Sequence, residues 1–436
     1  MKPLGWFGIV RLGLVQSAIG AIVMLATSLL NRVMVVEYAL PAALPAGLVA
    51  WHYAVQLSRP AWGHGSDRGR RRTPWIIMGM GILALGALLA VDALSLLAGR
   101  SAWGFALAVL AFAMIGGGVG AAGTSLLALL ATRVAPERRA AAASITWIMM
   151  IAGIVLSAGI AGALIDPFSL SRLAIVAGGV AGVALLVAIL AVWGVEGTAP
   201  APPVPVRDAA PVPAFRDALR DMWADGDARR FTAFVFLSML AYSMQDLILE
   251  PFAGLVFAFT PGQSTQLSGL QHAGVLAGMI LVGIGGSAFG TRGAGSLRRW
   301  IVGGCLGSAV ALGGLALAAR AGPGWPLAAN IVLLGFANGV FAVAAIGAMM
   351  GLAGEDRGRE GIRMGVWGAA QAIAFGLGGL IGAVGVDVGR ALIGSTTETF
   401  TIVFGAEALL FLAAASVALC GGVRATGQRF VARASA

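Results

Sequence analysis

The sequence predicts an all-α integral membrane protein with twelve transmembrane helices. Of its 436 residues, 59% are apolar and only 11% are charged, whereas an ordinary soluble domain has about 25% charged residues. A helix needs about 20 apolar residues to cross the hydrocarbon core of a bilayer, and the chain holds twelve apolar runs of about that length. Its basic residues also fall mainly in alternate loops. A soluble globular fold is therefore excluded.

The twelve expected spans extend along the whole chain. They cover residues 12–34, 40–58, 74–97, 103–131, 141–165, 173–195, 231–249, 267–290, 300–319, 325–350, 362–386 and 400–422. Lys2 and Arg11 precede the first run, which is longer than the apolar region of a signal peptide. We therefore expect the first run to stay in the membrane as a span.

The distribution of Lys and Arg residues predicts the orientation of the chain. The N-terminus, the even-numbered loops and the C-terminal tail hold 24 of the 29 basic residues. The opposite side holds five, which are Arg32, Arg100, Arg172, Arg320 and Arg390. Because cytoplasmic loops carry the excess of basic residues, we expect both termini in the cytoplasm. The formal charge of +10 has the same explanation, so nucleic-acid binding is not expected.

One long polar segment divides the spans into two sets of six. It begins with the Pro-rich stretch EGTAPAPPVPVRDAAPVP, which is typical of an extended linker. Further on, Phe215, Leu219, Met222 and Trp223 recur at three- and four-residue steps, which predicts an amphipathic helix on the cytoplasmic membrane surface. We therefore expect a six-helix bundle over residues 1–195, a cytoplasmic linker over 196–230 and a second six-helix bundle over 231–436, the layout of two parallel repeats.

The loop between the second and third spans resembles the signature loop of the major facilitator superfamily. In that loop a Gly is followed by Asp-Arg, another Gly and a basic pair, and the matching residues here are Gly63, Asp67, Arg68, Gly69, Arg70 and Arg71. One residue is missing between Arg68 and Gly69. Glycines permit a tight turn, and the Asp can accept charge-assisted hydrogen bonds. The resemblance implies a major-facilitator-like fold, and the alternative is an ordinary basic turn.

Span seven is the least lipid-like segment of the chain. It carries Gln245, Asp246 and Glu250, and its two carboxylates lie four residues apart, on one face of a helix. A carboxylate near the centre of a bilayer costs at least about 2.5 kcal/mol, so we expect both to face protein or a wet cavity. They form either a structural ion pair at a helix end or a proton or ligand site.

Arg32 and Glu37 lie at the equivalent end of span one. We expect Arg32 to pair with Asp246 or Glu250 and to hold the two halves of the chain together on the non-cytoplasmic side. The predicted polar lock or ligand site therefore consists of Gln245, Asp246, Glu250, Arg32 and Glu37.

Longer stretches resemble one family of this superfamily. Residues 244–257 (MQDLILEPFAGLVF) and 265–272 (TQLSGLQH) closely resemble the PucC/LhaA family of phototrophic bacteria, which is associated with bacteriochlorophyll delivery and light-harvesting complex assembly. Further similar stretches are residues 31–37, 124–132, 335–343 and 367–371. Because these stretches lie in both halves, the resemblance covers the whole chain.

The resemblance implies a non-enzymatic assembly factor, or chaperone, for photosynthetic light-harvesting antennae. Such a protein is expected to pass bacteriochlorophyll to the antenna α/β polypeptides or to hold the nascent complex. The implied location is the cell inner membrane or the intracytoplasmic photosynthetic membrane. The implied partners are these polypeptides, the core reaction-centre complex, bacteriochlorophyll and membrane lipid, and a carotenoid or a lipid is a further candidate for the bound molecule.

Two other functions compete with this one. A carrier of polar solutes needs ionisable groups at mid-depth, and spans one, four and ten offer only neutral polar side chains there. A major-facilitator transporter of a lipophilic small molecule escapes this argument and stays the alternative. A prenyltransferase-type enzyme needs clustered aspartates for magnesium diphosphate. The cluster Asp217, Asp221 and Asp225 is interspersed with arginines, which favours a surface helix.

Two histidines within spans are candidate ligands for the magnesium of bacteriochlorophyll, which needs one axial ligand. His272 precedes Gly274 and Gly278, whose missing side chains would leave a flat surface for the ring. His52 lies between two aromatic residues that could border a ring edge. For either residue the alternative is a hydrogen-bonded packing histidine. No other metal site and no catalytic residue is expected.

Overall fold

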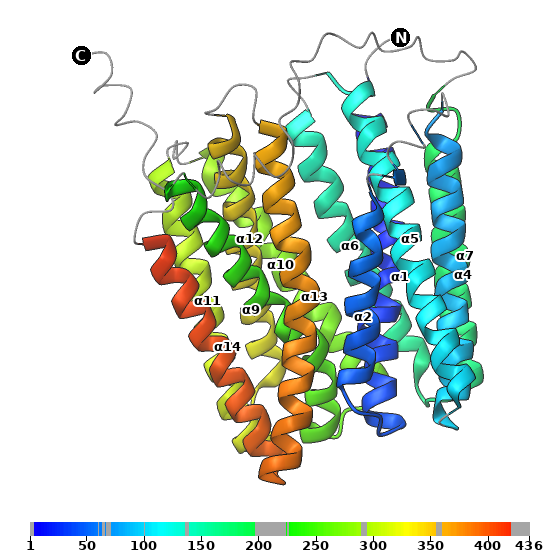
Figure 1. Ribbon diagram of the computed structural model, residues 1–436, viewed down its shortest axis with the longest axis vertical. Helices are drawn as coiled ribbons and strands as arrows, with labels where there is room; N and C mark the ends of the chain where they lie inside the picture. The colour runs from blue at the N-terminus through cyan, green and yellow to red at the C-terminus, as the bar shows by residue number, and fades with distance from the viewer. Residues whose placement is uncertain are drawn as a thin grey trace. The chain divides into compact units, whose positions relative to one another are not determined.

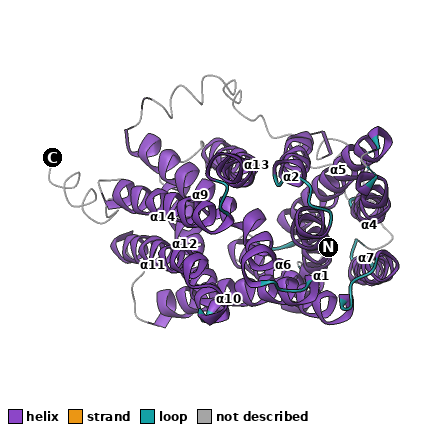
Figure 2. Cartoon of the chain, turned by 90° about the horizontal axis from the view of Figure 1, so that it is seen from below, coloured by secondary structure: helices purple, strands orange, loops and turns teal. Residues whose placement is uncertain are grey.

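The computed structural model describes residues 4–59, 61–62, 66, 71–99, 101–135, 139–196, 224, 226–288, 294–354 and 360–419. Within these ranges every regular element is a helix (Figures 1 and 2). The predicted amphipathic helix over residues 215–223 lies outside the described residues.

The helices follow the apolar runs of the sequence. They are α1 (Trp6–Met24), which continues through the π-helical segments Leu25–Leu30 and Val33–Glu37, α2 (Ala43–Val55), α4 (Thr73–Ala98), α5 (Ala102–Arg133), α6 (Arg139–Ile165), α7 (Leu170–Val192), α9 (Gly226–Phe257), α10 (Pro261–Ala288), α11 (Ala294–Ala321), α12 (Leu327–Gly354), α13 (Glu360–Ile393) and α14 (Thr396–Leu419). Short 3₁₀ turns occur at Gln56–Ser58 and Gly322–Gly324.

Ten of the described helices are long and apolar enough to cross a membrane. The chain is therefore a multi-pass membrane protein. The two remaining expected spans correspond to α2 and α10. Helix α2 has 13 residues, which gives a length of about 20 Å, and α10 begins with the polar sequence PGQSTQLSGLQH.

The chain forms two compact units. The first comprises Met1–Pro203, Asp246–His272 and Val386–Val388, and the second comprises Val204–Gln245, Ala273–Gly385 and Gly389–Ala436. The first unit therefore contains more than the first six expected spans. It also includes the end of α9, the beginning of α10 and a short piece of α13, all of which come from the second half of the sequence.

Each unit is built on close helix pairs. In the first unit α4 packs along α5 (Figure 1), and α1 packs along α6 and α7. In the second unit α11 packs against α12 and α14. Glycines allow some of these backbones to meet, as small residues do in membrane helices generally. A Cβ atom on Gly153 of α6 would lie 2.1 Å from the carbonyl oxygen of Ser17 in α1.

The first helix of each half of the sequence ends in the same way. Ala39, after α1, has a φ angle of 49°, and Ala258, after α9, has a φ angle of 56°. In both places the next N–H group donates a hydrogen bond six residues back, to the carbonyl of Met34 after α1 and of Ala253 after α9. This left-handed end is a known helix terminator. The local structure of the two halves therefore repeats at this point.

The contact at Gly153 gives a test of the helix packing. We expect Gly153→Ala to lower the thermal unfolding midpoint of the detergent-solubilised protein, because the added methyl group pushes α1 away from α6 at a cost of about 1–3 kcal/mol. Gly159→Ala, in the same helix, is the control, because nothing lies within 4 Å of a Cβ atom there. The control is expected to be neutral or slightly stabilising. Equal midpoints for the two variants would contradict the packing.

Candidate functional site

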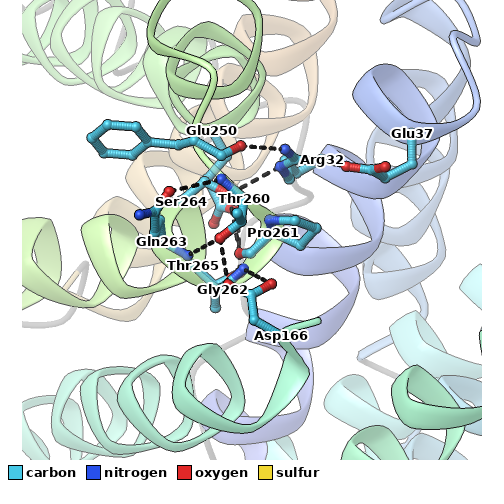
Figure 3. A network of polar contacts seen from close by, with 11 residues as sticks. Arg32, Glu37, Asp166, Glu250, Thr260, Pro261, Gly262, Gln263, Ser264 and Thr265 are labelled. Atoms are coloured by element: carbon cyan, nitrogen blue, oxygen red, sulfur yellow. Dashed lines mark hydrogen bonds and ion pairs between the residues drawn. The ribbon is translucent and has the colours of Figure 1, made fainter. Parts of the chain in front are cut away.

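A network of buried polar side chains surrounds Arg32 in the first unit (Figure 3). Its members come from the π-helical end of α1, the end of α9, the beginning of α10 and the end of α6. A π-helix is a wider turn than an α-helix and occurs often at functional sites. Ser28 and Glu37 lie within the two π-helical segments, and Arg32 directly precedes the second.

Arg32 is the centre of this network. Its guanidinium group is only 2% exposed and forms an ion pair with Glu37. Its Nε donates a hydrogen bond to the Ser264 hydroxyl at 3.0 Å, and its Nη2 donates one to the Phe259 carbonyl at 2.7 Å. Burying a charge is tolerable only when it is paired and hydrogen-bonded. The charge of Arg32 meets both conditions.

Glu250 is the second buried charge-bearing residue of the network. It is 2% exposed, and the Ser28 hydroxyl donates a hydrogen bond to one of its carboxylate oxygens. The Thr265 hydroxyl lies 3.4 Å from the other oxygen. The positive charge of Arg32 also acts on this carboxylate. The direct ion pair of Arg32, however, is with Glu37 on its own helix and not with Glu250.

Two further contacts fix this arrangement. The Asn31 amide, which is 1% exposed, donates a hydrogen bond to the Leu247 carbonyl at 2.7 Å. The Asp166 carboxylate accepts hydrogen bonds from the Gly262 backbone N–H, at 3.2 Å, and from the Thr260 hydroxyl (Figure 3).

Just beyond the π-helical segment, partial burial and the neighbouring Glu37 raise the pKa of the Tyr38 phenol, which therefore stays neutral.

The other predicted residues of the polar lock lie elsewhere. Asp246 is one turn from Glu250 and does not share its contacts. It lies near the side chains of Gln271 and Tyr53, and its Oδ1 atom has no hydrogen-bond partner among the described residues. Gln245 belongs to the second unit, where it is fully buried and neither of its amide atoms has a described partner.

The structure distinguishes the two candidate histidines. The Nδ1 atom of His272 lies 2.9 Å from the Ser268 carbonyl oxygen. A carbonyl can only accept, so Nδ1 carries the proton and Nε2 keeps its lone pair, which is the arrangement of a metal-binding histidine. The Nε2 atom of His52 instead lies 2.8 Å from Gln56, and its Nδ1 is buried. His272 thus keeps a lone pair on Nε2, whereas the Nε2 of His52 is occupied by its contact with Gln56.

The motif loop is described only in part. Gly63, Asp67, Arg68, Gly69 and Arg70 lie outside the described residues, and Arg71 lies just inside them. The described residues contain no group of three or more His, Cys, Asp or Glu side chains that could hold a metal ion.

Sequence reasoning missed several members of the network. Ser28, Ser264 and Thr265 are ordinary hydroxyl residues that nothing in the sequence distinguishes from others in the spans. Asp166 gives a weak signal, because it stands directly after an expected span. Outside the network, in the second unit, sequence reasoning also missed Glu407, which is fully buried in α14 and gave a clear signal as a single carboxylate within an apolar run.

The network predicts a large effect of removing the charge of Arg32. We expect Arg32→Met to lower the stability of the detergent-solubilised protein by about 2–3 kcal/mol, because the Ser264 hydroxyl and the Phe259 carbonyl lose their donor. Thermal unfolding measures the effect. In the matched control, Arg320→Met removes the exposed ion pair with Glu398, which has a length of 3.2 Å, and should cost less than about 1 kcal/mol. A similar loss in both variants would argue against a buried ionic network.

Comparison with known proteins identifies relatives along the whole chain. A family model described as PUCC protein matches residues 29–425. The protein named "Bacteriochlorophyll synthase 44.5 kDa chain" from Rhodobacter capsulatus is 54% identical over 427 residues, which cover 97% of each chain. "Protein PucC" from the same species is 31% identical over 431 residues, which cover 94% of this chain and 91% of that one.

Solved structures of transporters share the fold. A bacterial homologue of the human lysosomal transporter Spinster, in an inward-facing and unoccupied conformation, matches with a TM-score of 0.73 at 16% identity, covering 95% of this chain and 96% of that chain. The nucleoside transporter NupG matches with a TM-score of 0.62 at 16% identity, covering 94% and 98% of the two chains. The fold is therefore that of the major facilitator transporters, as the signature loop predicts.

Proposed function

Because the chain belongs to the PucC protein family, we propose that it is an assembly factor for photosynthetic light-harvesting complexes. In this role it handles bacteriochlorophyll and holds the antenna α/β polypeptides while they insert. The observation that carries the proposal is the contact of His272 Nδ1 with a backbone carbonyl, which leaves the lone pair on Nε2, in a chain whose relatives have photosynthetic names.

His272 is the residue that would hold the pigment. Its Nδ1 is occupied by a backbone carbonyl of its own helix, which orients the ring and directs Nε2 outward from that contact. The residue as a whole is half-buried. A bound bacteriochlorophyll would supply a magnesium ion, which the Nε2 of His272 would hold. His52 is not proposed as a ligand, because Gln56 occupies its Nε2.

A non-enzymatic role is favoured by how the carboxylates are used. Glu250 is engaged by the hydroxyls of Ser28 and Thr265, and Asp166 is engaged by the backbone of α10. Neither carboxylate is left to bind the magnesium diphosphate that a prenyltransferase requires. The name of the 54% identical relative includes the word synthase, but we do not propose a synthase activity for this chain.

The proposed topology has twelve spans and both termini in the cytoplasm. Length and composition identify ten of these spans, and we add α2 and α10 as the other two. The polar residues at the beginning of α10 face the Arg32 network instead of lipid, which makes a membrane position tolerable. The excess of basic residues in the even-numbered loops gives the orientation. The proposed location is the photosynthetic or cell inner membrane.

The alternative function is transport of a lipophilic small molecule. It is favoured by the fold of the solved relatives and by Asp246, whose Oδ1 has no hydrogen-bond partner among the described residues. A lipophilic cargo needs few ionisable groups along its path, so the low charge content agrees with both functions. A carotenoid or a lipid could be the bound molecule of an assembly factor or of a lipophilic transporter.

The pigment site is tested by absorption spectroscopy. We expect the gently purified protein, expressed in a phototrophic host, to carry a stoichiometric near-infrared band of bacteriochlorophyll. His272→Leu should reduce that band about tenfold or more, because the metal loses its axial ligand. His52→Leu is the control and should keep the band. An unchanged band in the His272 variant would exclude this ligand, and no band in any preparation would oppose pigment handling.

Antenna assembly is tested in cells. We expect the double variant Asp246→Asn, Glu250→Gln to insert in the membrane in normal amounts and to lower the antenna level several-fold, because it removes two of the few carboxylates within the spans. Immunoblots of membranes measure insertion, and whole-membrane spectra measure the antenna. Glu398→Gln, on the exposed ion pair, is the control. Normal antenna levels in the double variant would count against a role of these carboxylates.

A further inference from the structure

Asp92 places a carboxylate on the outer surface of a membrane-spanning helix. It belongs to α4 of the first unit and is exposed. The helix has 26 residues and is therefore about 39 Å long, whereas the hydrocarbon core of a bilayer is about 30 Å thick. Asp92 lies six residues before the last residue of α4, Ala98, which is about 9 Å from that end. With α4 centred in the bilayer, the carboxylate lies about 5 Å inside the hydrocarbon core.

The surface around Asp92 is apolar and extends over two helices. Leu88 and Leu85, one and two turns before Asp92, are both exposed. Helix α7 packs beside α4 (Figures 1 and 2), and a Cβ atom on Gly178 of α7 would lie 3.8 Å from Leu88 Cδ2. Because consecutive spans alternate in direction, α4 and α7 are antiparallel. Ile175, which is 74% exposed, therefore lies at about the depth of Asp92.

The structure gives the Asp92 carboxylate no hydrogen-bond or ion-pair partner among the described residues. The nearby Ser95 hydroxyl donates to the backbone carbonyl of Asp92 and not to its side chain. Arg172, at the beginning of α7, donates to the Pro167 carbonyl. Within the described part of the chain, no other exposed carboxylate lies more than one turn inside a membrane-spanning helix. Charged side chains at this depth normally face protein or water, so Asp92 needs a partner from outside the chain.

Two glycines of α7 make the same surface suitable for close approach. Gly179 and Gly182 are exposed, and nothing lies within 4 Å of a Cβ atom at either position. By contrast, Gly79 and Gly118 serve the contact of α4 with α5, because a Cβ atom there would lie 2.5 Å and 2.6 Å from backbone nitrogens of the facing helix. Small residues let membrane helices approach each other closely. The two exposed glycines leave that possibility unused within the described chain.

We propose that the outer surface of α4 and α7, defined by Leu85, Leu88, Asp92, Ile175 and Gly182, is a docking surface for a membrane-spanning helix of another protein. That helix carries an arginine or a lysine at the depth of Asp92. The proposal is based on charge complementarity, because the pair takes a carboxylate and a cation out of contact with lipid at the same time. It goes beyond the proposed function, since it involves neither the pigment nor His272 and identifies the partner by its charge alone.

The experiment measures binding of a defined helix within a membrane. Full-length protein with Cys305 and Cys420 replaced by alanine carries an acceptor dye at a cysteine introduced for Ser171, an exposed residue at the beginning of α7. It is reconstituted in phosphatidylcholine vesicles. The probe is a synthetic helix of leucine and alanine, as long as α4, with one arginine six residues from its donor-labelled end. A matched peptide has leucine in place of the arginine. Energy transfer is followed as the peptide-to-lipid ratio rises.

We expect the arginine peptide to bind about three- to tenfold more tightly than the leucine peptide, as a polar contact between membrane helices allows. Asp92→Asn should abolish this difference. Asp92→Arg should reverse it, so that a matched glutamate peptide binds more tightly than the arginine peptide. Ser95→Ala is the control and should keep the preference for arginine, because this exposed residue is one turn away and does not contact the carboxylate. Thermal unfolding confirms that each variant is folded.

Three results would overturn the proposal. The first is equal binding of the arginine and leucine peptides to the unmodified protein, which would leave Asp92 to lipid headgroups. The second is a preference for arginine that survives in Asp92→Asn. The third is energy transfer between donor- and acceptor-labelled copies of the protein, without peptide, that Asp92→Asn abolishes, because the surface would then be an interface between two copies of this chain.

Discussion

The first unit depends on the buried guanidinium of Arg32. A charge inside a membrane span is costly unless protein groups replace its water, and one arginine offers five N–H donors to be satisfied. Glu37 supplies the counter-charge from the same helix, while Ser264 and Phe259 supply acceptors from the second half of the sequence. The charge can therefore stay buried only while the end of α9 and the beginning of α10 are in place. Gly254 leaves the space that this requires, because a Cβ atom there would lie 3.1 Å from Arg32 Nη2.

The sequence predicts the helices well, because a bilayer forces each apolar run into the same structure. Arg32 and Glu250 could also be predicted as members of one site, since charged side chains within spans must face protein or water instead of lipid. Their actual pairing could not be predicted. Whether Arg32 meets Glu37 or Glu250 depends on the two π-helical segments of α1, and no residue pattern in that stretch indicates a wider turn.

Contacts with the backbone show a more general limit of sequence reasoning. Asp166 binds a backbone N–H group, which every residue except proline possesses, so the sequence contains no partner to search for. The histidines show a similar limit. His52 and His272 occupy comparable apolar surroundings in the sequence, and the difference between them is which ring nitrogen a neighbour occupies. Which nitrogen is occupied depends on the side-chain rotamer and, for His272, on the position of the Ser268 carbonyl.

The distribution of polar groups also constrains what the protein can bind. Most carboxylates of the first unit are committed to serine and threonine hydroxyls or to helix ends, which leaves them little capacity to recognise a hydrophilic solute. Among the described residues of the first unit, the groups that keep unused capacity include the Nε2 of His272 and the Oδ1 of Asp246, beside neutral polar atoms such as the Nε2 of Gln271. A ligand that fits this chemistry is mainly apolar and offers one metal ion or one polar group. A magnesium chlorin meets that description, because its ring is apolar and its metal needs a single axial nitrogen. For the same reason a lipophilic transport substrate is the natural competitor.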